Sequence, residues 1–101
     1  MDVDRFHMTV IFTKFARKQI SKCPQQVKEK IADWLFSIEH DGLEETRKRS
    51  GFHDEPLHGK RQNQRSIRLN RQWRLIYQED KDAGHVFIIV LEVNPHDYRV
   101  R

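Results

Sequence analysis

The sequence predicts an α+β fold in the order β-α-α-β-β-β, with a helical hairpin packed on a mostly antiparallel four-stranded sheet. Three observations predict it: a segment of β-forming residues near the N-terminus, a long stretch with helical apolar spacing, and three strand-like segments in the second half. The 101 residues, of which 37% are apolar and 34% charged, suit one domain spanning residues 1–101.

The first half of the chain predicts one strand and two helices. Residues 8–12 are rich in β-formers and are followed by Thr13, a candidate N-cap for a short basic helix over 14–22. Pro24 suits the first turn of a second helix. One apolar stripe defines that helix: Val27, Ile31, Trp34, Leu35 and Ile38. We expect Gly42 to end it, because glycine readily adopts the left-handed conformation that follows a helix.

The second half predicts a long connection and three strands. Residues 43–63 are polar and basic, and long connections in compact domains are often functional. Two strands over 64–69 and 72–78 are joined by a tight turn at Asn70-Arg71, since asparagine tolerates positive φ. The unbroken apolar run within 86–93 predicts a last strand covered on both faces.

Alternation along the central hairpin separates two kinds of side chain. One face carries the apolar set: Ile67, Leu69, Trp73, Leu75 and Tyr77. The other carries Arg68 and Arg74, which flank the turn and can approach one another across the paired strands. Two guanidinium groups suit phosphate oxygens and stabilise charge that develops on a phosphoryl group. The spacing equally fits ordinary arginines on a solvent-exposed sheet face.

The positive charge is concentrated in one segment. The net charge is +4, yet residues 47–74 hold nine Lys/Arg against two acidic residues, a balance of +7, so the remainder carries −3. Such asymmetry indicates a polyanionic partner, nucleic acid first. A solvated loop and strand face would have the same composition.

Several classes of protein are disfavoured. The strongest apolar run, 86–91, is far shorter than the roughly 20 residues of a membrane-spanning helix. Cys23 is the one cysteine, and residues 1–8 have no signal-peptide pattern, so we expect a cytoplasmic location. The sequence has neither a Gly-rich nucleotide loop nor zinc-ligand spacing, and we expect no cofactor and no metal.

Titratable side chains gather in the long connection and at the C-terminal end. Glu55 and His58 lie in the connection, and His96 follows the last strand. A carboxylate and an imidazole at two ends of a basic cleft can act as general base and general acid. Cleavage of RNA needs that pair, because the 2′-hydroxyl loses a proton and the leaving 5′-oxygen gains one. Tyr98 is a candidate for stacking on a base. Histidines of this kind are also common on polar surfaces.

Three segments carry a family resemblance. Residues 55–60 (EPLHGK), 65–70 (RSIRLN) and 73–77 (WRLIY) resemble the RelE/ParE toxin superfamily of bacterial type II toxin–antitoxin systems. The pattern is most similar to the YoeB- and HigB-like ribosome-dependent mRNA endonucleases. The resemblance covers residues 8–98, implies the β-α-α-β-β-β fold, and makes residues 1–7 an N-terminal extension.

The resemblance also implies roles for individual residues. Glu55 matches the general base, although His58 is an alternative because related toxins use a loop histidine. Arg74 matches the residue that steadies the cleaved phosphate, and His96 with Tyr98 matches the C-terminal general acid and its aromatic neighbour. Here Asp97 separates those two, whereas YoeB-like chains end in His-Tyr. The implied RNA-binding set is His58, Lys60, Arg61, Arg65, Arg68 and Arg71.

The function implied is a metal-independent endoribonuclease that cuts mRNA on the ribosome and leaves a 2′,3′-cyclic phosphate and a 5′-hydroxyl. The implied partners are a cognate antitoxin protein, the ribosome and mRNA. Two alternatives remain at this point: a ParE-like gyrase inhibitor without catalytic residues, and a non-enzymatic RNA- or ribosome-binding module.

Overall fold

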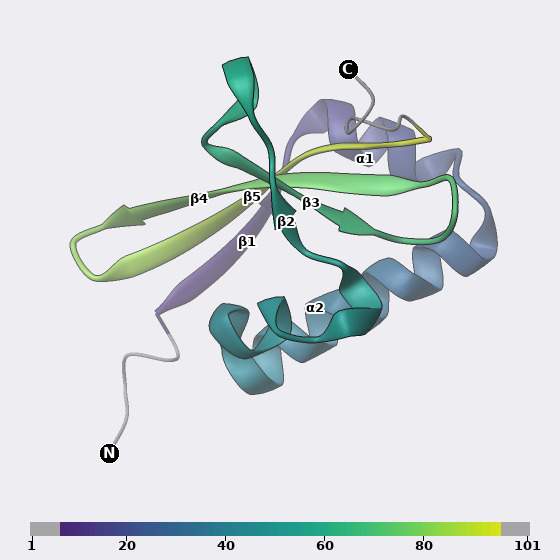
Figure 1. Ribbon diagram of the computed structural model, residues 1–101. Coiled ribbons are helices and arrows are strands. Elements are labelled where there is room, and N and C mark those ends of the chain that lie inside the picture. The colour runs from purple at the N-terminus through teal and green to yellow at the C-terminus, as the bar shows by residue number, and fades with distance from the viewer. Residues whose placement is uncertain (1–6, 96–101) are drawn as a thin grey trace.

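The computed structural model describes residues 7–95 and packs two helices against a five-stranded sheet (Figure 1). The elements are β1 (Met8–Phe12), α1 (Lys14–Ser21), α2 (Gln25–Arg47), the 3-10 helix η2 (Ser50–Phe52), β2 (Glu55–Pro56), the 3-10 helix η3 (Gly59–Arg61), β3 (Gln64–Arg68), β4 (Arg74–Asp82) and β5 (His85–Asn94). The strand order is β1-β5-β4-β3-β2, with β1 parallel to β5 and the other pairs antiparallel. The predicted α+β class is confirmed. No helix within residues 7–95 combines the length and apolarity needed to cross a bilayer.

The fifth strand, β2, lies inside the predicted connection. It pairs with β3 through two residues, Glu55 opposite Ser66 and Pro56 opposite Arg65. A two-residue strand has no readable alternation, and proline is unfavourable within a sheet except at an edge, where β2 lies. The prediction of four strands was therefore wrong by this one short element.

Both predicted helices form, with one change at Gly42. Thr13 caps α1, because its Oγ1 accepts a hydrogen bond from the Ala16 N–H at 3.0 Å. Gly42 has φ 86° and interrupts α2, but the helix resumes over 43–47 instead of ending. Thr46 holds the two parts together: its Oγ1 donates to the Gly42 carbonyl at 2.8 Å and lies 2.7 Å from Ser37 Oγ in a buried position. The predicted helix end is thus a kink.

The turn between β3 and β4 closes in another way than predicted. Strand pairing stops at Arg68 opposite Arg74, which leaves a five-residue connection. Asn70 does not take positive φ; its Oδ1 accepts hydrogen bonds from the N–H groups of Gln72 and Trp73, both at 2.8 Å. The side chain of Asn70 therefore stabilises the turn, in place of the left-handed backbone conformation that was expected there.

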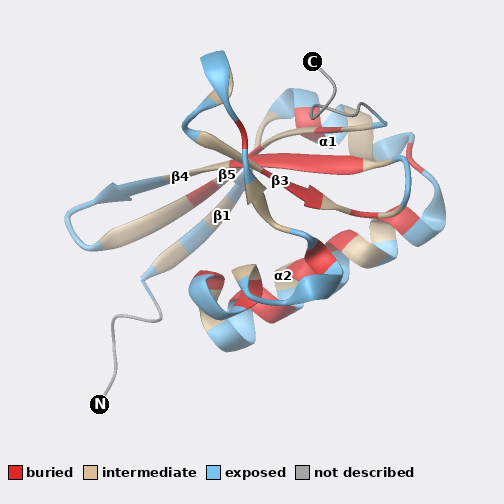
Figure 2. Cartoon of the chain, viewed as in Figure 1, coloured by how far each residue is buried: buried red, intermediate tan, exposed pale blue. Residues whose placement is uncertain are grey.

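The core lies between the helices and the inner face of the sheet, which we define as the face in contact with them. Figure 2 shows that burial concentrates in α2 and the central strands, whereas the tip of the β4–β5 hairpin is exposed. The predicted inner-face residues Ile67, Leu69, Leu75 and Tyr77 all join the core, with Trp73 packed against it. The rings of Trp34 and Tyr77 meet at 5.3 Å between centroids. The apolar pattern thus placed this face correctly.

The last strand is less covered than its apolar run suggested. Ile88, Val90 and Val93 are buried, but Phe87, Ile89 and Leu91 remain half-buried. The helices cover one face of β5 only, so the prediction of coverage on both faces was wrong.

The core makes a direct stability prediction. Leu75 is fully buried, so Leu75→Ala should lower the free energy of unfolding by about 2–5 kcal/mol through lost burial and a residual cavity. Ile11 is 42% exposed, and Ile11→Ala should cost well under half as much. Urea denaturation of both variants measures the two values; equal losses would contradict the assignment of the core.

Candidate functional site

The face of the sheet that looks away from the helices, the outer face, carries a row of mostly polar residues across β2 to β5. Directly paired residues of antiparallel strands project to the same side of a sheet. The strand registers therefore place Glu55, Ser66, Ile76 and Glu92 in one row of the outer face. Glu55 thus lies on the face predicted for the arginine pair.

The next row holds that arginine pair. Arg68 is paired with Arg74, and Arg74 with Asn94, so the three side chains lie side by side at one end of the outer face. Alternate residues of a strand are about 6.8 Å apart, which is the spacing between this row and the row of Glu55. The predicted approach of the two arginines across the hairpin is confirmed.

Arg74 is a buried side chain, only 6% exposed. Its Nη1 donates to the backbone carbonyls of Asn70 and Trp73 at 3.1 and 3.2 Å, so the turn itself fixes the guanidinium. The buried Nε of Arg68 has no hydrogen-bond partner within residues 7–95. Two adjacent positive charges in a half-buried row favour an anion as ligand, and phosphate oxygens match the guanidinium geometry.

The η3 segment extends over the outer face. Arg61 bonds Glu92 Oε2 at 2.5 Å and Gln64 Oε1 at 2.7 Å, both on the outer side of the sheet. Figure 1 shows the chain rising from β2 into this segment on the side away from α2. The predicted residues Glu55, Arg61, Arg68 and Arg74 are therefore brought to one face.

Glu55 carries an uncommitted carboxylate. The side chain is half-buried and makes no hydrogen bond or ion pair with the described part of the chain. A carboxylate beside two arginines and free of other bonds can accept a proton from a bound hydroxyl. Chemically, the outer face combines a base candidate with two candidate phosphate ligands.

Not every predicted residue joins this group. Arg65 alternates with Ser66 and Gln64, so it projects to the inner face, where its Nε bonds Asp54 Oδ1 at 2.5 Å. His58, Lys60 and Arg71 are exposed on the η3 segment and the β3–β4 turn. His96 and Tyr98 lie outside the described residues. Within residues 7–95, no cluster of three His, Cys, Asp or Glu side chains has the arrangement of a metal site.

Comparison with known proteins gives a result only at the level of structure. No protein-family model matches the chain, and no curated protein matches it in sequence. The YoeB/ParE toxin from Agrobacterium tumefaciens superposes with a TM-score of 0.70 at 18% identity, over 89% of this chain and 100% of that one. YafQ from Escherichia coli strain BL21(DE3) gives 0.68 at 12% identity, over 86% and 91% of the two chains. YoeB from Staphylococcus aureus, described as a dimer, gives 0.65 at 21% identity, over 90% and 99%.

The chain has the fold of the YoeB and YafQ toxins. The predicted RelE-like fold is therefore confirmed, including the helical hairpin and the mostly antiparallel sheet. At these identities the likeness concerns the fold, and the residue roles depend on the geometry of the outer face.

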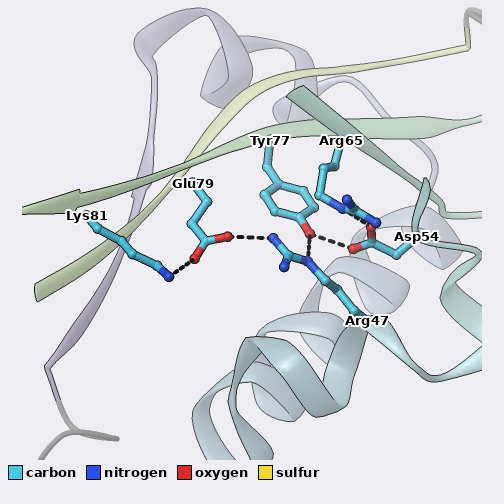
Figure 3. A network of polar contacts seen from close by, with 6 residues as sticks. All are labelled: Arg47, Asp54, Arg65, Tyr77, Glu79 and Lys81. Atoms are coloured by element: carbon cyan, nitrogen blue, oxygen red, sulfur yellow. Dashed lines mark hydrogen bonds and ion pairs between the residues drawn. The ribbon is translucent and has the colours of Figure 1, made fainter. Parts of the chain in front are cut away.

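The YoeB-like fold here contains an inner-face polar network that the sequence did not reveal (Figure 3). Tyr77 is fully buried, donates to Asp54 Oδ2 at 2.5 Å, and accepts from Arg47 Nε at 3.2 Å. Arg47 also bonds Glu79 at 2.6 Å, and Asp54 bonds Arg65. The network joins the C-terminal end of α2 to β3, β4 and the residue before β2. A signal existed in the sequence: Tyr77 and Glu79 place polar atoms on the apolar face of β4.

The environment shifts two pKa values within this network. Burial, and then the Asp54 carboxylate, raise the pKa of the Tyr77 hydroxyl well above its usual value near 10. Burial by itself lowers the pKa of Arg47, but hydrogen bonds to Tyr77 and Glu79 outweigh that effect and raise it. Tyr77 therefore stays a neutral donor and Arg47 stays charged.

The raised pKa of Tyr77 predicts a loss of stability in alkali. Above about pH 10 the unfolded chain releases this proton while the folded chain keeps it, so the free energy of unfolding falls by about 1.4 kcal/mol per pH unit. Tyr77→Phe should remove that component. Urea denaturation of both proteins from neutral pH upward measures the difference; parallel curves above pH 10 would show that Tyr77 titrates normally.

Proposed function

We propose that this protein is the toxin of a type II toxin–antitoxin pair, a ribosome-dependent mRNA endonuclease. The observation that carries the proposal is the outer face, where a free carboxylate, Glu55, lies one row from the guanidinium pair Arg68 and Arg74. The fold shared with YoeB and YafQ supports the class. A gyrase inhibitor of the same fold would not need this combination of base and phosphate ligands.

The proposed reaction is an in-line transfer within the RNA, without a metal. The Glu55 carboxylate takes the proton of the 2′-hydroxyl, and the 2′-oxygen forms a bond to the adjacent phosphorus. Arg68 and Arg74 stabilise the charge that builds on the phosphoryl oxygens. The bond to the 5′-oxygen breaks, which leaves a 2′,3′-cyclic phosphate and a 5′-hydroxyl.

The leaving 5′-oxygen needs a proton, and His96 is the proposed general acid. Asn94 is paired with Arg74, so β5 ends beside the arginine pair. Two further residues of chain span at most about 7 Å, so the proposal needs His96 to reach only the row next to Asn94. Tyr98 is the proposed stacking residue for a base. Lys60, His58 and Arg71, which are exposed, are proposed to bind the RNA backbone.

A cognate antitoxin is the proposed inhibitor. YoeB from S. aureus has been solved in complex with YefM, and E. coli YafQ in complex with DinJ. The +7 segment of this chain contains most of the outer-face cations, so an acidic segment of an antitoxin would neutralise the same surface that binds RNA.

The first functional prediction concerns the substrate. The purified protein should cleave mRNA bound to ribosomes and leave naked RNA nearly intact, because the outer face holds few catalytic groups and needs the RNA to be held in place. Primer extension on one transcript, with and without ribosomes, measures this. Equal cleavage of naked RNA would refute ribosome dependence, and relaxation of DNA supercoiling without any cleavage would indicate a gyrase inhibitor.

The second functional prediction separates the base candidates. Glu55→Gln should slow single-turnover cleavage about 10²–10⁴-fold, as expected for loss of a general base, whereas His58→Gln should weaken binding with little change in the chemical step. His96→Gln should be as damaging as Glu55→Gln. Lys60→Ala serves as the control and should only lower the salt dependence of binding by about one unit. The opposite ranking of Glu55 and His58 would transfer the base role to the histidine.

The arginine pair needs conservative variants because Arg74 is buried. Arg74→Lys keeps the charge but loses the planar guanidinium whose Nη1 bonds both turn carbonyls, and we expect the cleavage rate to fall about 10²–10³-fold, typical of a lost preorganised donor. Arg71→Lys, a change at an exposed neighbour in the same turn, keeps the charge proposed to bind the RNA backbone and should leave the rate of the chemical step near that of the parent.

A further inference from the structure

The strand that carries Glu55 is weakly held by its own backbone. β2 is two residues long and lies at the edge of the sheet. Its ladder is short: Glu55 is paired with Ser66, and beyond Pro56 the Leu57 N–H donates to the Gln64 carbonyl at 2.9 Å. The free edge of β2 has no further strand beside it within residues 7–95. Just upstream, His53 adopts a left-handed conformation with φ 51°. Backbone pairing alone therefore leaves Glu55 poorly fixed on the outer face.

Asp54 supplies a second attachment on the opposite face. Its side chain is only 1% exposed, and each carboxylate oxygen has one short contact: Oδ1 with Arg65 Nε and Oδ2 with the Tyr77 hydroxyl, both at 2.5 Å. Hydrogen bonds to an ionised acceptor are about twice as strong as neutral ones. These contacts attach the residue before β2 to both β3 and β4.

The donors are themselves fixed in place. Tyr77 is fully buried against Trp34, and burial with the adjacent carboxylate keeps its hydroxyl protonated. Arg47, from the end of α2, donates to the Tyr77 oxygen and so orients the phenolic proton toward Asp54 (Figure 3). Successive residues of a strand project to opposite faces, so fixing Asp54 inward directs Glu55 outward.

We infer that Asp54, held by Tyr77 and Arg65 on the inner face, is the positioning group that fixes Glu55 beside Arg68 and Arg74 on the outer face. The inference rests on the proposed function and deepens it. Inner-face residues that do not contact the RNA affect the cleavage rate because they position Glu55. Buried ion pairs often add little to the stability of a protein. The inference gives the buried charges of this network a different role, the positioning of Glu55.

The first test measures the anchor without using activity. Tyr77→Phe removes one contact to Asp54, and Asp54→Asn weakens both. Hydrogen exchange of the Leu57 amide, which reports on β2 pairing, should become about tenfold faster or more in each, equal to about 1.4 kcal/mol of lost protection. Asp41→Asn is the matched control, because Asp41 pairs with Arg49 on the protein surface, and it should leave that exchange unchanged.

The second test distinguishes positioning from general stability. Tyr77→Phe should slow ribosome-bound mRNA cleavage by about tenfold or more in the parent, but by less than about twofold in a Glu55→Gln background, because coupled residues are non-additive. A purely structural role would lower the active fraction equally in both backgrounds. The assays are run far below the melting temperature of every variant.

The outcomes separate the two proposals. Unchanged Leu57 exchange in Tyr77→Phe, or additive effects on the rate, overturns the positioning role even if the protein cleaves mRNA. Faster exchange of Leu57 in a protein that cuts no RNA upholds the anchor and refutes the proposed function instead. Asp54→Asn is the more severe change, and if it does not fold, Tyr77→Phe still decides both tests.

Discussion

The register between β3 and β4, with Arg68 opposite Arg74, determines how the rest of the molecule is arranged. Strand side chains alternate with a period of two, so this register sends Ile67, Leu75 and Tyr77 toward the helices and the guanidinium groups of Arg68 and Arg74 away from them. A slip by one residue in either strand would place an arginine in the core and expose Leu75 or Ile67. The apolar core and the charged outer face therefore have a single cause.

The buried charged groups Arg74 and Asp54 each have two hydrogen-bond partners. Arg74 is bonded by carbonyls of its own turn, and Asp54 by side chains from β3 and β4. Removing one partner of such a group leaves an uncompensated charge in a region of low dielectric. The two sets of contacts lie on opposite faces of the sheet. Asp54 directly precedes β2, so α2 is linked to Glu55 on the outer face through Arg47, Tyr77 and Asp54.

Much of the fold and part of the site followed from local pattern. The helical stripe, the Thr13 cap and the strand alternation depend on neighbouring residues, and each is found in the structure. Arg65 was grouped with the outer arginines by charge alone, although its parity along the strand already places it with Ile67 on the inner face. Gly42 kinks α2 without ending it, because a tertiary contact between Ser37 and Thr46 favours a further helical turn.

The sequence by itself determined the two faces of the sheet, because hydrophobic burial acts on each residue according to its own side chain and its period along the strand. It also determined which residue types were available for phosphate chemistry. Only the tertiary structure decided that Glu55 lies in the row next to Arg68 and Arg74, and that Asp54 is held behind it. The contacts of Asp54 with Arg65 and Tyr77 join residues 11 and 23 positions apart in the sequence. β2 is too short to show an alternating sequence pattern, and such long-range contacts depend on the packing of the whole domain.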